Sequence, residues 1–197
     1  MNQWCFEENL QKIDSTSWSL LLDGVSSSRR PFHFGVFNSI DDDFPSARTV
    51  IIRSVYPELK QISFNTDIRS PKFQQLSKHP RVSWLFYDES LRIQLRCKAI
   101  ASLHINDQIA QDAWQQARLN CKITYTAPAA PGTPLDAPFL LDLNQLDIPD
   151  EQLTEAQKNF SVVQTKVLSM DWCFLHHKGN RRAYFDYQKN ESRWIQV

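Results

Sequence analysis

The sequence predicts a mainly β protein, an antiparallel β-barrel accompanied by a few short α-helices. Several segments alternate between apolar and polar residues or are rich in β-branched residues, as strands are. The links between successive segments are mostly of hairpin length, which favours antiparallel pairing. The strands number about six, enough for a sheet to close on itself.

Composition limits the class of protein. The chain has 197 residues, which suffices for one domain, and we expect a single domain over residues 1–197. Its 22 basic and 22 acidic side chains cancel, so no overall field attracts nucleic acid or an anionic membrane. No apolar run has the length of a membrane span, and the four cysteines lack metal-ligand spacing and suggest reduced thiols. We therefore expect a cytoplasmic protein with no nucleic-acid or membrane partner.

Residues 1–30 form the expected N-terminal helical segment. Asp14 or Ser15 is a plausible N-cap, and apolar residues from Trp18 onward recur at helical spacing. The stretch from Gly24 into the following serines predicts the end of this helix.

The middle of the chain alternates between strands and one short helix. Strands are expected over residues 33–38, 47–55, 61–66, 81–88 and 91–104. The second and third can form a hairpin across YPELK. Residues 70–80 change to helical period, with Ser70 as the cap and Pro71 at the first helical position.

The last third begins with a helix and a long loop. A helix is expected over residues 107–120, with Trp114 and other apolar residues on one face. Residues 122–150 are a Pro-rich loop, followed by a helical turn over 154–160. The final strands are expected over residues 162–177 and 181–188, joined by a KGN turn, and the terminal WIQV resembles one more edge strand.

The segment FNTDIRSPK suggests an anion site. It carries four polar or basic side chains on a strand-to-helix turn: Thr66, Arg69, Ser70 and Lys72. A helix N-terminus presents free N–H groups and partial positive charge, and Arg48 on the preceding strand would complete a phosphate cradle. The alternative is an ordinary capped helix with solvated surface charges.

Four segments in order carry a family resemblance: RTVIIR, ISFNTDIRSPK, QQLSKHPRVSWLFY and LRIQLRCKA. Their order and spacing resemble the FMN-binding half of the pyridoxamine 5′-phosphate oxidase-like family, and DWCFLHHKGNRRAYF resembles its closing strand pair. The similarity covers roughly residues 15–187. PGTP at 131–134 and the NRRAYF ending resemble the branch described mainly as an FMN-binding domain. The resemblance implies a six-stranded antiparallel split β-barrel of the FMN-binding type, with FMN as cofactor.

The resemblance also implies ligands for the FMN phosphate. Arg48 matches the arginine that opens the family's first motif, and Ser70 and Lys72 match the serine and lysine of the later turn. Pro71 stands where the oxidases usually carry a second basic residue, and the adjacent Arg69 is expected to supply that charge.

The flavin ring has its own implied contacts. The strand whose backbone lines the ring matches four consecutive residues: Thr49, Val50, Ile51 and Ile52. Asn65 and Thr66 match an aromatic–threonine pair, although Asn65 lacks the aromatic ring. Gln94 matches a glutamine that reaches the flavin, commonly across a dimer interface.

A homodimer with flavin sites at the interface follows from the same resemblance. An independent observation points the same way, because the strand segments 81–87 and 167–175 carry more apolar residues than one small barrel needs. The surplus is expected to suit a symmetric interface.

A small-molecule substrate is expected near a second basic group. Trp114, Arg118 and Lys122 are spaced by four residues along the expected helix, and the first two approximate the family's substrate-phosphate residues. Arg181 and Arg182 approximate the arginine of the closing motif. The alternative is a packed tryptophan beside solvated charges. The histidine after the closing arginine and a Gln-Ser pair before the last helix are missing, so the sequence departs from the vitamin-making oxidases.

The expected function is that of an FMN-dependent oxidoreductase, an oxidase or reductase in which the flavin carries the electrons. No catalytic residue is assigned. The alternatives are a non-catalytic flavin carrier or sensor, and a split barrel that binds another cofactor, such as haem with His176 or His177 as an axial ligand. No metal site is expected, because adjacent histidines on a strand point to opposite faces.

Overall fold

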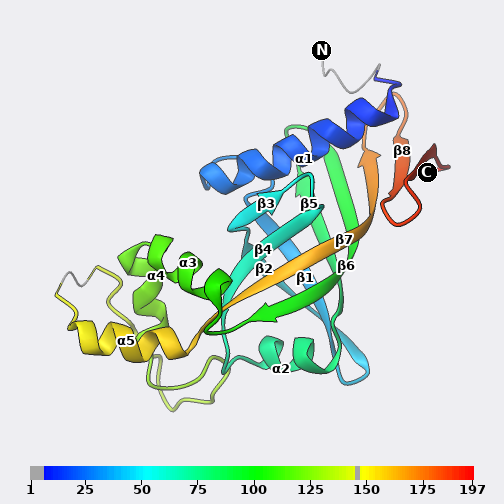
Figure 1. Cartoon of the computed structure of the whole chain (residues 1–197). Helices are drawn as coiled ribbons and strands as arrows, with labels where there is room; N and C mark the ends of the chain where they lie inside the picture. The colour runs from blue at the N-terminus through cyan, green and yellow to red at the C-terminus, as the bar shows by residue number, and fades with distance from the viewer. Residues whose placement is uncertain (1–6, 145–146) are drawn as a thin grey trace.

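A nine-stranded sheet organises the computed structural model, which describes residues 7–144 and 147–197 (Figure 1). The strands are β1 (Phe34–Asp41), β2 (Phe44–Ile51), β3 (Ser54–Tyr56), β4 (Gln61–Asp67), β5 (Arg81–Asp88), β6 (Ile93–His104), β7 (Phe160–Phe174), β8 (Arg181–Asp186) and β9 (Glu191–Trp194). The helices are α1 (Leu10–Ser26), α2 (Pro71–Lys78), α3 (Gln108–Gln116), α4 (Leu119–Ile123) and α5 (Asp150–Lys158), with a 3₁₀ turn η2 (Thr124–Thr126). Every strand pairing is antiparallel, so the mainly β antiparallel fold is confirmed, although the described strands number nine where six were expected.

The expected strand 47–55 is two strands, and this break splits the barrel. The sheet order is β2-β1-β5-β6-β7-β4-β3, with β8 and β9 added beside β7. The Ile52 N–H donates to His33 O at 3.1 Å, whereas the Arg53 N–H donates to Ser63 O at 2.8 Å. The chain therefore leaves the β1 side of the barrel for the β4 side between these two residues. Over the described residues no ladder joins β2 to β4, so hydrogen bonds do not close the sheet there.

Helix α1 lies across one end of the barrel and α2 across the other (Figure 1). The sequence-based cap was wrong: α1 begins after Asn9, whose Oδ1 accepts from Lys12 N at 3.0 Å. It also continues through Gly24, where an added Cβ would lie 2.8 Å from the Pro31 carbonyl oxygen. The missing side chain thus lets the helix approach the loop before β1.

Asp14 anchors α1 to the sheet instead of capping it. Its Oδ2 lies 3.1 Å from Lys60 Nζ, and its Oδ1 accepts from the Tyr187 hydroxyl at 2.5 Å. The same hydroxyl accepts from Trp18 Nε1 at 2.9 Å, and the Lys60 ammonium lies over both aromatic rings. One carboxylate thereby joins α1 to the β3–β4 turn and to the end of β8.

We expect Asp14→Ala to lower the free energy of unfolding by about 1–3 kcal/mol, because Lys60 and Tyr187 lose their partly buried acceptor. Urea denaturation measures the change. The matched control is Asp23→Ala, also on α1, whose carboxylate is half-exposed and pairs with Arg30 at 3.4 Å. That variant should change stability by no more than about 0.5 kcal/mol. Equal effects would contradict the anchoring role of Asp14.

An aromatic cluster fills the barrel. Trp84 lies 4.9 Å from Phe37 and 5.4 Å from Phe86 between ring centroids, and all three are at most 1% exposed. Met170 and Trp172 are also buried within this chain. The large apolar side chains of segments 81–87 and 167–175 are therefore mostly used inside one barrel. Tyr87 is exposed and Leu85 and Leu168 are only half-buried, so the expected symmetric interface stays a prediction.

The helix expected over 107–120 is broken. Helix α3 ends at Gln116, Ala117 is extended with φ −67° and ψ 136°, and Arg118 is the N-cap of α4. The sequence analysis predicted one helix face for Trp114, Arg118 and Lys122. This prediction was wrong, because the three residues lie on two separate helices or their caps. Just before the break, Trp114 packs into a second core, with its ring 5.2 Å from that of Phe160.

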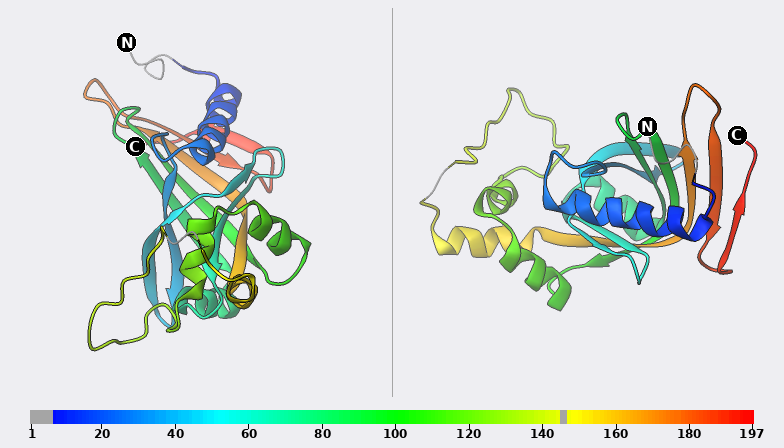
Figure 2. Two further views of the ribbon diagram at one scale, coloured as in Figure 1. Left: turned by 90° about the vertical axis from the view of Figure 1, so that its left-hand side faces the viewer. Right: turned by 90° about the horizontal axis from the view of Figure 1, so that it is seen from above.

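Helices α3, α4 and α5 form a lobe beside the barrel, and the long loop that leads to α5 projects away from it (Figure 2). The predicted loop 122–150 begins later, because α4 and η2 continue to Thr126. Helix α5 also begins earlier than expected, at Asp150. Several apolar side chains of the loop are exposed to solvent, among them Leu135 (56%), Phe139 (54%) and Leu140 (90%).

Candidate functional site

Arg48 lies at the α2 end of the barrel, on the inner face of β2. It is in register with the buried Phe37 of β1, and directly opposed residues face the same side of a sheet. Among the described residues its guanidinium donates only to neutral oxygens: Nη1 to Ser39 Oγ at 2.6 Å, and Nη2 to Ser46 Oγ at 2.7 Å and Gln75 Oε1 at 3.0 Å. The side chain is thus oriented without losing its charge.

Lys72 approaches from the first turn of α2. Its Nζ donates to Thr66 Oγ1 at 2.9 Å, and that oxygen lies 3.4 Å from Ser70 Oγ. Thr66 and Ser70 are both buried, and the Ser70 hydroxyl donates to the Asp67 carbonyl at 2.7 Å. The turn therefore brings together three of the four side chains that the sequence analysis placed on it. We call Arg48, Thr66, Ser70 and Lys72 the inner cluster.

Neither cation of the inner cluster forms a direct ion pair among the described residues. Burial lowers the pKa of the Lys72 ammonium, and the nearby Arg48 lowers it further, while Asp67 acts in the opposite direction. Burial also lowers the pKa of Arg48, against the influence of Asp41. None of the ion pairs among the described residues includes Arg48 or Lys72. Two partly buried, mutually repelling cations of this kind are suited to hold an anion.

Arg69 lies in a different arrangement. Its Nη2 is 2.7 Å from Asp67 Oδ2, and its Nη1 donates to the Ala127 carbonyl at 3.0 Å. The hydrogen bonds to Asp67 raise the pKa of the guanidinium. Arg69 therefore holds the strand-to-helix turn against the chain that follows η2, and this arrangement does not support its expected role as a phosphate ligand.

A cleft of about 780 Å³ lies on the outer side of β4 and β7, bounded by the end of α1 and by α3 and α4. Residues from the break between β2 and β3 line it, including Ile52 and Arg53, as do Asn65 and Arg118. Asn65 and Thr66 are consecutive on β4, and successive strand side chains point to opposite faces. The cleft and the inner cluster therefore lie on opposite faces of the same strand.

Arg53 lines the cleft, but the sequence analysis did not name it as a site residue. Its Nη2 lies 3.8 Å from Cys121 Sγ, and with Arg118 it brings two cations to the lining of the cleft. The available signal was its place at the end of RTVIIR, directly after the segment expected to line the flavin. The strand break that turns it toward β4 has no clear sequence signature.

The other residues expected to contact FMN belong neither to the inner cluster nor to the lining of the 780 Å³ cleft. Thr49 is exposed and opposes Val36, whereas Val50 packs against the barrel core. Ile51 opposes the exposed Phe34. Gln94 is on β6, in register with Tyr87 of β5 and Cys173 of β7, and lines neither cleft.

The expected substrate residues are also dispersed. Trp114 is buried in the second core and does not line the 780 Å³ cleft. Arg182 forms an ion pair with Asp171 at 2.7 Å, which also pairs with Arg96. All three line a second cleft of about 650 Å³ on the outer face of the sheet. Arg181 lies over the Trp194 ring. Of this set, only Arg118 reaches the larger cleft.

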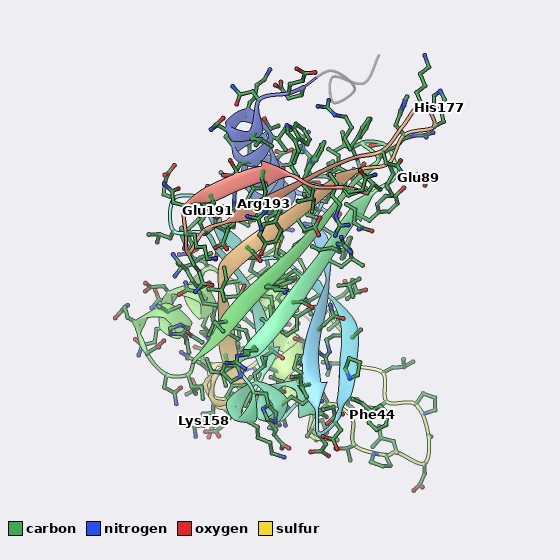
Figure 3. All side chains as sticks on the ribbon, turned by 90° about the vertical axis from the view of Figure 1, so that its right-hand side faces the viewer. Phe44, Glu89, Lys158, His177, Glu191 and Arg193 are labelled. Carbon is green, nitrogen blue, oxygen red and sulfur yellow. The ribbon has the colours of Figure 1, made fainter. Side chains whose placement is uncertain are left out.

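His176 and His177 follow β7, and Figure 3 shows His177 near the tip of the β7–β8 hairpin. Their ring centroids are 4.2 Å apart, and neither residue lines either cleft. No group of three or more metal-ligating side chains occurs within residues 7–144 and 147–197. In the same ranges, no helix is long and apolar enough to cross a membrane. The described cysteines, Cys97, Cys121 and Cys173, are free thiols, while Cys5 lies outside the described residues.

Comparison with known proteins identifies the class. Residues 15–104 match the family model of the pyridoxamine 5′-phosphate oxidase FMN-binding domain. The chain is also 32% identical over 100 residues to pyridoxine/pyridoxamine 5′-phosphate oxidase 2 of Arabidopsis thaliana. That match covers 47% of this chain and 50% of the relative, so it spans about half of the length of that curated protein.

Solved structures share the fold over nearly the whole chain. A pyridoxamine 5′-phosphate oxidase-related, FMN-binding protein of Nostoc punctiforme has a TM-score of 0.70 at 20% identity, covering 92% of this chain and 96% of that one. PhzG of Burkholderia lata has a TM-score of 0.68 at 13% identity, covering 100% and 96%. The shared fold is that of a split barrel. Residues 15–104 are thus similar to the FMN-binding domain of pyridoxamine 5′-phosphate oxidases, and the whole chain shares the fold of proteins related to them.

Proposed function

We propose that this protein binds FMN, with the phosphate on the inner cluster and the ring beside the β2–β3 break, and acts as an FMN-dependent oxidoreductase. The observation that carries the proposal is the pair formed by Arg48 and Lys72. Both are partly buried, and neither has a carboxylate partner among the described residues. A phosphate would neutralise both cations and relieve their repulsion.

The chain's own groups suit the parts of this ligand. Thr66 and Ser70 supply hydroxyls beside Lys72, and the first N–H groups of α2 add donors and partial positive charge. No ladder joins β2 to β4 among the described residues, so the ligand would extend between these two strands from the inner cluster to the cleft, where Ile52, Arg53 and Asn65 would flank the ring. When bound, the flavin supplies the hydride or electron transfer, and the protein supplies binding and electrostatics.

The cleft suits a small anionic substrate. Arg53 and Arg118 are its cationic residues, with Asp112 as an acidic one. Trp114, whose match to the family suggested a substrate contact, is occupied in the second core, which favours the alternative of a flavin carrier without turnover. Oxygen consumption or acceptor reduction by the flavin-loaded protein, tested with small anionic donors, would separate the two functions.

A homodimer would explain why Gln94 and Arg182 lie apart from the cleft within one chain. A second copy could bring such residues to the flavin, as the family resemblance implies. Support comes from the exposed apolar side chains of the loop at residues 135–143, since adjacent exposed apolar groups usually mark an interface. Light scattering should give the mass of a dimer, and Leu140→Glu should shift it toward the monomer. A monomeric wild type would refute this part.

The first test is an absorption spectrum of the purified protein, with mass spectrometry of whatever heat releases. Flavin bands and the mass of FMN are expected, and a colourless preparation should take up added FMN. A protein that is colourless and takes up none would overturn the proposal. A Soret band in place of flavin bands would identify haem as the cofactor.

FMN affinity should also depend on the charge of Lys72. The pKa of Lys72 lies below its ordinary value of 10.5, while a phosphate dianion favours its charged form. Affinity should therefore be full below the lowered pKa and weaken as the pH rises through it, by up to about tenfold per pH unit. Lys72→Arg, which keeps its charge, should stay flat in the same range. Fluorescence titration with FMN measures both, and parallel pH profiles would contradict the role of Lys72.

A further inference from the structure

We infer that Gln75 is a positioning residue that holds Arg48 in place while leaving its charge free for a phosphate monoester. This inference rests on the proposed function, which assigns the phosphate to the inner cluster. Gln75 is 7% exposed and projects from α2 toward β1 and β2. Its Oε1 accepts from Arg48 Nη2 at 3.0 Å and from Ser39 Oγ at 2.6 Å.

Gln75, Ser39 and Arg48 are each hydrogen-bonded to the other two. Ser39 Oγ accepts from Arg48 Nη1 at 2.6 Å, so its own proton is available for Gln75 Oε1. Both neighbours of that oxygen are therefore donors, which fixes the amide with its oxygen toward Arg48. The guanidinium is held at two nitrogens, and each acceptor that holds it is neutral.

Neutrality of the residue at position 75 is the feature that matters. A carboxylate there would accept from the same guanidinium as a charge-assisted ion pair, which is stronger than a neutral hydrogen bond. The formal charge of Arg48 and Lys72 together is two, and a buried carboxylate beside them would reduce it to one. A dianionic phosphate would then lose much of its attraction.

Helix α2 would therefore both supply a cation for the phosphate and orient Arg48. Lys72 and Gln75 are three residues apart on α2, so they lie on the same helix face. The first contributes a cation, and the second orients the cation contributed by β2. No local pattern indicates this role, because a glutamine in QQL is typical of any exposed helix.

The test compares Gln75→Glu with Gln74→Glu, its exposed neighbour on the same helix. Both variants add one negative charge to α2, but only the first places it against Arg48. We expect Gln75→Glu to raise the FMN dissociation constant by about 30–100-fold, with riboflavin binding changed less than about twofold. Gln74→Glu should change FMN binding less than about threefold. Flavin fluorescence titration gives all these constants.

A second variant covers the case in which Gln75→Glu fails to fold. Gln75→Met keeps the size and removes the acceptor, and it should weaken FMN by about five- to tenfold without affecting riboflavin. Equal loss of FMN and riboflavin would show a merely structural role, and unchanged FMN binding would refute any role. If the wild type binds neither flavin, the proposed function fails. The Gln75 inference is then decided with inorganic phosphate, which the wild type should bind and Gln75→Glu should not.

Discussion

Arg48→Ala should raise the dissociation constant for FMN by about 100-fold or more. The guanidinium offers charge-assisted hydrogen bonds to the phosphate, each worth about 1.5–3 kcal/mol, and roughly 3 kcal/mol corresponds to about a hundredfold. The variant also leaves Lys72 as the only cation of the inner cluster. Riboflavin, which has no phosphate, should bind with nearly unchanged affinity, so a paired fluorescence titration isolates the phosphate contribution.

The matched control is Arg29→Ala, which removes an exposed arginine from the loop after α1. Because Arg29 is on the surface and outside the inner cluster, its loss should change FMN affinity less than about twofold. Calorimetry of the unliganded proteins should show both variants folded. If Arg48→Ala bound FMN as tightly as Arg29→Ala, the phosphate could not lie on the inner cluster.

Trp84→Ala should lower the free energy of unfolding by about 3–5 kcal/mol, the largest stability change that we expect from a single substitution here. The indole is 1% exposed and lies between Phe37 and Phe86. Its Nε1 donates to Thr165 Oγ1 at 3.0 Å, which ties β5 to β7 across the interior. Removing the ring leaves a cavity among stacked aromatics that cannot easily collapse. Thermal unfolding should move down by about 10 °C.

Two further variants separate the causes. Trp84→Phe keeps most of the aromatic volume and loses the hydrogen bond, so we expect it to cost about 1–2 kcal/mol. Phe44→Ala removes an aromatic side chain that is 76% exposed at the start of β2 (Figure 3), and should cost no more than about 0.5 kcal/mol. If the two alanine variants had the same free energy of unfolding, the aromatic cluster would not be what holds the barrel together.

Local patterns in the sequence determined most of the elements. Alternation identified β1, β4, β5 and β6 within a few residues, because the period of two is a property of each strand by itself. Ser70 and Pro71 marked the start of α2, although the Ser70 hydroxyl donates to the Asp67 carbonyl and makes no capping hydrogen bond. The group Thr66, Ser70 and Lys72 could also be predicted, because its members lie within seven consecutive residues.

Long-range contacts decided the remainder. Asp14 is a favourable cap residue, but its carboxylate meets Lys60 and Tyr187, which no local pattern connects to it. Trp114 continued the expected helical stripe, yet its burial against Phe160 accompanies a break at Ala117. In each case a contact made after folding outweighs a local preference, because burial and buried hydrogen bonds exceed a propensity of a few tenths of a kcal/mol.

The same reason applies to the site. The sequence by itself determined the two motifs that carry the cations, RTVIIR with Arg48 and FNTDIRSPK with Lys72. Only the tertiary structure decided that they meet at the α2 end of the barrel, that Asp67 takes Arg69 away from them, and that Gln75 orients Arg48. These arrangements depend on the split between β2 and β4. At Ile52 and Arg53 the backbone changes its hydrogen-bond partner from His33, next to β1, to Ser63 of β4, and a local pattern in the sequence specifies neither partner.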